Sequence, residues 1–120
     1  MANRWIAAAG IGGCAGVALG AAGRHLAGDG GAALFDTASR YLLYHALALL
    51  AVALLESRGA SLLLGLAGWC FLLGMICFGG GLVALGLTGS ALAGFSTPVG
   101  GTLFMLGWLA LAGHGFGRRA

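Results

Sequence analysis

Between Gly59 and Gly117 the chain contains no Asp, Glu, Lys or Arg, and this charge-free run makes up almost half of its 120 residues. An ordinary soluble domain has about a quarter of its residues charged, whereas this chain has 8% charged and 60% hydrophobic residues. A soluble domain could not cover its surface with so few polar atoms, and disordered chains have the opposite composition. The sequence therefore predicts an integral membrane protein with a single domain, residues 1–120.

Four stretches are apolar over about 20 residues, the length that a helix needs to cross the hydrocarbon core. Arg4 and Arg24 bracket the first stretch, and a cluster of Gly, Ser, Thr and Pro between Thr88 and Pro98 divides the charge-free run. The alternation typical of membrane β-barrel strands is missing. We expect an all-α fold, an integral membrane four-helix bundle with short loops, whose helices cover about residues 5–23, 36–55, 61–87 and 99–114.

Two glycine-rich stretches modify this pattern. Gly28–Gly31 and the charges around it predict a break, and hence a short polar periplasmic segment between the first two helices. Gly79–Gly81 lies inside the third helix and predicts a kink or a thin point there.

The arginines predict the orientation of the chain, because cytoplasmic loops carry an excess of Arg and Lys. With four spans, both termini and the second loop lie on one side of the membrane. That side has Arg4, Arg58, Arg118 and Arg119, and the opposite side has Arg24 and Arg40. We therefore expect both termini to be cytoplasmic. The scattered arginines form no basic stripe, so no nucleic-acid partner is expected.

Small residues recur on one face of the first helix, where Gly12, Gly16 and Gly20 are spaced by four positions. Such a smooth stripe lets another helix backbone approach closely in a membrane. It predicts helix packing, either within the chain or against another subunit. The three cysteines stand in apolar runs without C-x-x-C spacing, and we expect them to be small packing residues.

The start of the second predicted helix carries polar side chains over about half of its circumference. Together with His25, which lies on the same membrane side, they form what we call the polar seam: His25, Asp36, Arg40, Tyr41, Tyr44 and His45. Because lipid offers polar groups no partners, we expect the seam to face the bundle interior or a cavity. Asp36 and Arg40 are spaced for an ion pair, which we expect to be partly buried.

Three interpretations of the polar seam remain open. It can fix helix register as a satisfied polar contact, or it can hold the head group of a small quinone- or lipid-type ligand. The third is a metal or haem bound by His25 and His45, although two histidines alone do not specify such a site. No nucleophile stands with a base and an orienting group, so we expect no catalytic residues, no metal site and no cofactor.

Four motifs of the chain are similar to those of a known family. They are Gly20–His25, Phe35–Ala46, Phe78–Gly81, and Thr97–Gly101 followed by Gly107-Trp108. The chain has these motifs in the same order as that family. Over essentially its whole length it resembles the small four-helix inner-membrane family of bacteria typified by YgdD and YwdK. Members of that family usually have a small residue at position 24 and Ser at positions 79 and 81, where this chain has Arg24, Gly79 and Gly81.

The resemblance implies the fold and a multi-pass location in the bacterial inner membrane, and it implies no biochemical activity. The lipid bilayer is the first expected partner. From the short loops and the glycine stripe, we expect not an enzyme but an accessory or scaffold subunit that packs against another membrane protein or against further copies of itself. The alternative is a transporter, a channel or a small-ligand binding protein that uses the polar seam.

Overall fold

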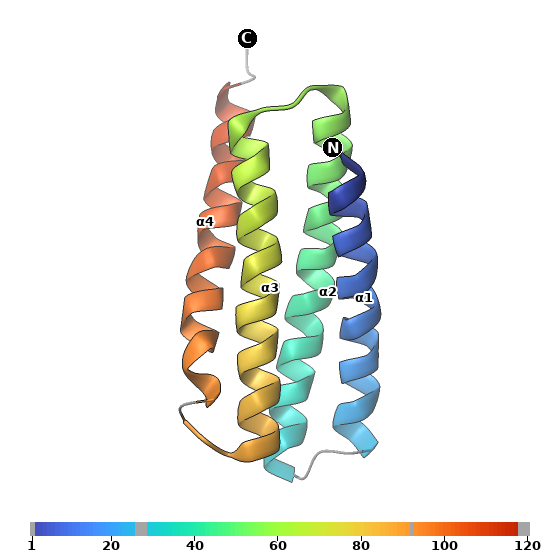
Figure 1. Ribbon diagram of the computed structural model, residues 1–120, viewed down its shortest axis with the longest axis vertical. Coiled ribbons are helices and arrows are strands. Elements are labelled where there is room, and N and C mark those ends of the chain that lie inside the picture. The colour runs from blue at the N-terminus through green and yellow to red at the C-terminus, as the bar shows by residue number, and fades with distance from the viewer. Residues whose placement is uncertain (1, 26–28, 92, 118–120) are drawn as a thin grey trace.

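The computed structural model describes residues 2–25, 29–91 and 93–117, and it contains four long helices joined by short connections (Figure 1). The elements are α1 (Ala2–His25), α2 (Asp29–Arg58), α3 (Leu62–Thr88), the short 3-10 helix η1 (Ala93–Phe95) and α4 (Ser96–Gly117). All four long helices are apolar enough to cross a membrane. The bundle is 52 Å long, which exceeds the hydrocarbon core of about 30 Å. The predicted all-α membrane bundle is therefore confirmed, with helix ends that reach beyond the hydrocarbon.

The second helix begins earlier than its sequence predicts. Residues 29–31 form the first turn of α2, so the break predicted at Gly28–Gly31 is wrong for these three positions, and Gly28 lies outside the described residues. The first four N–H groups of a helix have no partner within the helix, so its first turn is held by fewer internal hydrogen bonds than its middle. Glycine is tolerated there. Gly31 is also buried, with its Cα 3.7 Å from where a Cβ on Gly86 would lie. The glycines thus bring α2 and α3 together.

The third helix has well-defined ends, which agree with the division predicted between Thr88 and Pro98. The Ser61 hydroxyl accepts the Leu64 N–H at 3.1 Å and caps the start of α3. At the other end Gly89 adopts the left-handed conformation, with φ of 71°, and its N–H donates to the Leu85 carbonyl. Both devices satisfy backbone groups that a helix leaves unpaired at its termini.

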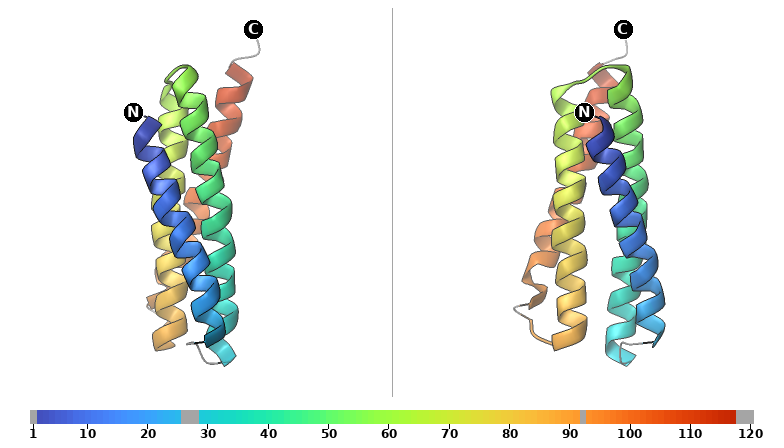
Figure 2. Two further views of the ribbon diagram at one scale, coloured as in Figure 1. Left: turned by 90° about the vertical axis from the view of Figure 1, so that its right-hand side faces the viewer. Right: turned by 45° about the vertical axis from the view of Figure 1, so that its right-hand side comes forward.

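Each helix packs along the next one in the chain, so the four lie side by side in the order α1, α2, α3, α4 (Figure 1). Figure 2 shows α1 and α4 on opposite sides of the α2–α3 pair. The start of α1, the α2–α3 connection and the end of α4 share one end of the bundle. In the described part of the chain, no Cα atoms of α2 and α4 lie within 8 Å of each other. Side chains must therefore fill the space between these two helices.

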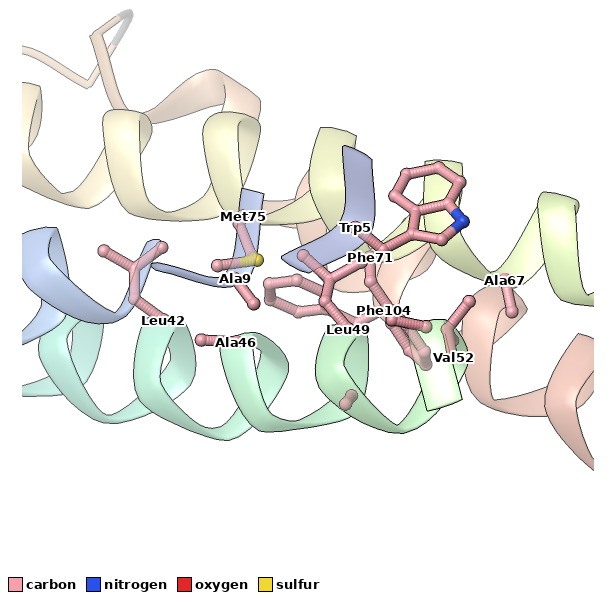
Figure 3. Close-up of a cluster of buried hydrophobic side chains, with 12 residues drawn as sticks. Trp5, Ala9, Leu42, Ala46, Leu49, Val52, Ala67, Phe71, Met75 and Phe104 are labelled. Atoms are coloured by element: carbon pink, nitrogen blue, oxygen red, sulfur yellow. The ribbon is translucent and has the colours of Figure 1, made fainter. Parts of the chain in front are cut away.

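The core is built from large side chains that meet small ones (Figure 3). The Trp5 indole lies over Gly68, where an added Cβ would be 2.5 Å from Trp5 Cζ2. Phe71 lies against Gly107 in the same way, 2.7 Å from the position of an added Cβ. Because lipid is as apolar as leucine, such close packing, and not the hydrophobic effect, holds membrane helices together.

Candidate functional site

The polar seam divides into one buried residue and five exposed ones. His45 is buried, with 4% of its surface exposed. The exposed members are His25, Asp36, Arg40, Tyr41 and Tyr44. Of the predicted interior or cavity positions, His45 is in the interior, and His25, Asp36 and Tyr41 line surface hollows. Arg40 and Tyr44 lie outside these hollows. The opposite half of the helix forms the main contact, with Ala38, Leu42, Ala46 and Leu49 buried.

The position of Asp36 and Arg40 near the start of α2 explains why these two charges are exposed. Asp36 is seven residues from the start of α2, or about 10 Å at 1.5 Å per residue. A charge at this depth reaches the membrane interface, and the long Arg40 side chain can extend toward water. The rule that polar groups face inward applies only within the hydrocarbon core.

Asp36 and Arg40 form the predicted ion pair, but on the surface. Arg40 Nε lies 3.4 Å from Asp36 Oδ2, and the two side chains are 56% and 67% exposed. The expected partial burial of this pair is therefore wrong. Solvent and lipid head groups screen such a pair, so its charges do little to hold the bundle together.

A double-mutant cycle of Asp36→Asn and Arg40→Gln is expected to give a coupling energy of about 0.3–0.5 kcal/mol, the usual value for an exposed i,i+4 pair. The measurement is the free energy of unfolding of the four proteins in mixed micelles. A coupling above about 2 kcal/mol would contradict an exposed pair, because only a desolvated charge leaves so large a penalty when its partner is removed.

His45 connects α2 to α4 through one ring nitrogen and bonds the backbone of its own helix through the other. Trp108 Nε1–H donates to His45 Nε2 at 3.1 Å. Because an indole N–H can only donate, Nε2 is the unprotonated nitrogen, and Nδ1–H donates to the Tyr41 carbonyl at 2.7 Å. The imidazole also stacks on Phe104, with ring centroids 3.6 Å apart. The hydrogen-bonding capacity of His45 is thus used within the chain.

Two separate hollows receive the two seam histidines. His45 lines a groove of about 440 Å³ between α2 and α4, together with Tyr41, Phe104 and Trp108. His25 lines a hollow of about 430 Å³ between the end of α1 and the start of α2. The other residues of that hollow include Arg24, Asp36 and Ser39. A metal or haem site that uses both histidines has no geometric basis in this arrangement.

The glycine stripe of α1 packs within the chain. The Ser39 hydroxyl donates to the Gly16 carbonyl at 2.6 Å, and an added Cβ on Gly20 would lie 3.0 Å from Ser39 Oγ. An added Cβ on Gly12 would overlap Met75 of α3. Of the two alternatives for the stripe, the structure shows contact with α2 and α3 of the same chain.

The four sequence motifs pair with each other in space. Gly20–His25 packs on Phe35–Ala46, because Gly23 makes room for Phe35 and Gly20 for Ser39. Phe78–Gly81 packs on Thr97–Gly101 at the crossing of α3 and α4. An added Cβ on Gly81 would lie 2.5 Å from Thr97 Oγ1. α3 continues unbroken through Gly79–Gly81, so these glycines act as the predicted thin point.

Glu56 is a polar residue that the sequence reasoning missed. It lies near the end of α2 with its side chain 5% exposed, and its Oε1 has no hydrogen-bond partner among the described residues. Trp5 Nε1 donates to its Oε2 at 3.4 Å, and Arg4 Nη2 lies 3.9 Å from the same oxygen. Its signal in the sequence is that it is the only Glu of the chain.

Comparison with known proteins gives a family and relatives without an assigned activity. A family model described as Protein of unknown function (DUF423) matches residues 19–101. A UPF0382 membrane protein of Staphylococcus epidermidis is 38% identical over 78 residues, 65% of this chain and 63% of the relative. A UPF0382 membrane protein of Haemophilus influenzae is 41% identical over 78 residues, 64% and 61% of the two chains. UPF0382 membrane protein YwdK of Bacillus subtilis is 35% identical over 100 residues, 79% and 81%.

The matches to the Staphylococcus epidermidis and Haemophilus influenzae relatives span less than two thirds of those proteins. No solved structure matches the chain. YwdK is one of the two proteins that typify the family resembled by the sequence motifs, and the resemblance is thereby confirmed. The relatives are named membrane proteins, in agreement with the four apolar helices. This chain is a membrane protein and belongs to the DUF423 family of unknown function.

Proposed function

We propose that the chain is an accessory subunit without enzymatic turnover, which packs in the membrane against a helix of a larger membrane protein. The observation that carries this proposal is an apolar groove of about 940 Å³ along α1 and α3. Its floor contains small residues, and its walls contain the long apolar side chains of both helices. Residues that line it include Gly12, Ile76, Gly79, Gly80 and Val83.

The splay of α1 away from α3 forms this groove. The two helices approach each other near Trp5 and Gly68, and they diverge toward the opposite end of the bundle (Figure 2). An added Cβ on Gly80 would meet no atom within 4 Å, so the groove is open at that point. A glycine-floored, membrane-facing groove supports close approach of another helix backbone.

The engagement of the polar side chains supports a packing role over turnover. His45 is hydrogen-bonded at both nitrogens, Asp36 is paired with Arg40, and Ser39 is bonded to the α1 backbone. Recognition by the membrane-facing surface then rests on van der Waals fit, which is how membrane helices associate.

Photo-crosslinking in native membranes tests this proposal. A photoreactive amino acid at Ile76 in the groove is expected to give an adduct with another membrane protein. The matched control is the same amino acid at Leu109 of α4, which is equally exposed but outside the groove, and it is expected to give lipid adducts only. Gly80→Leu should abolish the Ile76 adduct, because it fills the groove from a position where an added Cβ meets no atom of the bundle.

Three outcomes would contradict the accessory role. Identical adducts at Ile76 and Leu109 would remove the groove as a specific surface. An Ile76 adduct that survives Gly80→Leu would do the same. An adduct whose mass is twice that of the chain would mean that the partner in the groove is a second copy of the chain and not a larger membrane protein.

We also propose that the chain lies in the bacterial inner membrane with both termini in the cytoplasm. The arginine count supports this orientation, although Arg118 and Arg119 lie outside the described residues. In a background without the native cysteines, Arg58→Cys is expected to react with an impermeant maleimide only in inside-out vesicles. The control Ser90→Cys, in the connection at the other end, should react only in intact spheroplasts. The reverse pattern would overturn the orientation.

A further inference from the structure

The Glu56 carboxylate lies in an unusual environment for a charged group. It is almost completely buried, and its Oε1 finds no hydrogen-bond donor in the described part of the chain. The two contacts to Oε2, from Trp5 at 3.4 Å and from Arg4 at 3.9 Å, are both long. A buried carboxylate is costly unless hydrogen bonds and an opposite charge satisfy it. Glu56 therefore has unused capacity to accept hydrogen bonds.

A cavity of about 300 Å³ lies beside this carboxylate. Its volume is at the lower limit of small-ligand pockets. Residues that line it include Arg4, Glu56, Ser61, Gly65, Leu66 and Trp69. An added Cβ on Gly65 would meet no atom within 4 Å, so this side of the cavity is open space. Trp69 is half-exposed, as is typical of tryptophan at a membrane interface.

The charges of the cavity point to a ligand with two opposite charges. Arg4 is 42% exposed, and its guanidinium lies over the Trp5 ring, 4.6 Å from the centroid. It can therefore meet an anion near the surface, while Glu56 can accept from a cation deeper in the protein. The Ser61 hydroxyl is used by the Leu64 N–H and by His114. A simple amine would compete with Arg4 for the Glu56 carboxylate and bring no anion for the guanidinium, and a simple phosphate would meet the Glu56 carboxylate.

We propose that this end of the bundle binds the zwitterionic phosphoethanolamine head group, with its ammonium on Glu56 and its phosphate on Arg4. The exposed apolar side chains of Leu62, Leu66 and Trp69 lie beside the cavity, so acyl chains attached to the head group continue along a lipid-facing surface. The natural source is then an ethanolamine phospholipid of the adjoining leaflet. This site lies apart from the α1–α3 groove, so it is independent of the accessory role.

Native mass spectrometry of the purified protein with an equimolar mixture of phosphatidylethanolamine and phosphatidylglycerol, of matched acyl chains, tests the site. The wild type is expected to retain phosphatidylethanolamine about tenfold better, which corresponds to about 1.4 kcal/mol. Glu56→Gln keeps the shape but removes the charge, and it should abolish the preference. The matched control Asp36→Asn removes an exposed carboxylate at the other end, and it should keep the preference.

Gly65→Leu provides a second variant that leaves every charged group in place. It fills the cavity from a position where an added Cβ meets nothing, so it should reduce retention of phosphatidylethanolamine to that of phosphatidylglycerol even if Glu56→Gln fails to fold. Equal retention of both lipids by the wild type would overturn the proposal. A full preference in a folded Glu56→Gln or Gly65→Leu protein would overturn it as well.

Soluble phosphoethanolamine distinguishes the two sources of this head group. If millimolar phosphoethanolamine fails to displace the retained lipid, the site belongs to the membrane lipid, as proposed here. If it displaces the lipid, the same chemistry is bound without acyl chains, which supports the site and assigns it also to a soluble ligand.

Discussion

Gly100→Ala is expected to lower the free energy of unfolding by about 2 kcal/mol, whereas Gly101→Ala should leave it unchanged or raise it slightly. An added Cβ on Gly100 would overlap the Phe78 amide nitrogen and lie 2.8 Å from the Gly74 carbonyl oxygen. Both atoms belong to the α3 backbone and cannot rotate away, so α3 and α4 must separate. Such overpacking costs about 1–3 kcal/mol, and it outweighs the gain in helix propensity of up to about 1 kcal/mol.

The neighbouring glycine is the matched control for this prediction. An added Cβ on Gly101 would lie 4.0 Å from Phe78 Cδ2, an ordinary contact. The two variants therefore share the change in helix propensity and differ only in the clash with α3. Denaturant titration in mixed micelles, followed by circular dichroism, measures both. Equal stabilities of the two variants would mean that α3 and α4 do not cross at Gly100.

The spans could be predicted because their signal is local. The charge-free run from Gly59 to Gly117 has length for two helices, and the turn-forming residues after Thr88 show where they divide. The start of α2 is harder to predict. Asp29, Gly30 and Gly31 have the composition of a loop, but the first turn of a helix tolerates it, and Gly31 is buried in the packed structure.

The orientation of the polar seam could not be predicted from helical periodicity. Periodicity correctly separates Asp36 and Arg40 from Leu42 and Ala46, which lie on opposite sides of α2. It does not show which side faces the neighbouring helices. That choice depends on depth in the membrane, since a charged pair near a helix end can reach water, and on the fit of Ser39 against the α1 glycines.

The environment of Glu56 depends on contacts between distant segments. Trp5 is 51 residues away in sequence and donates to Glu56 from α1. Nothing in the residues next to Glu56 indicates this contact, and a charge near a helix end is typical of a membrane protein. A site formed by side chains from three helices becomes visible only when their packing is known.

His45→Ala is expected to lower the free energy of unfolding by about 3 kcal/mol. The ring is buried between α2 and α4, where it stacks on Phe104 and accepts from Trp108. Removing a buried ring leaves a cavity, and large aromatic residues cost about 3–5 kcal/mol when truncated to Ala. His25→Ala removes an exposed histidine and serves as the control, with no expected change.

His45→Phe separates the contribution of the ring from that of its hydrogen bonds. Phe keeps the stacking on Phe104 but leaves the Trp108 N–H without its acceptor. Hydrogen bonds between membrane helices contribute about 0.6 kcal/mol on average and at most about 1.7 kcal/mol, so His45→Phe should cost about 1 kcal/mol. In the His45→Phe background the hydrogen bond is already absent. Trp108→Phe should therefore cost only the packing that the indole loses. If His45→Phe is as damaging as His45→Ala, polar contacts and not packing connect α2 to α4.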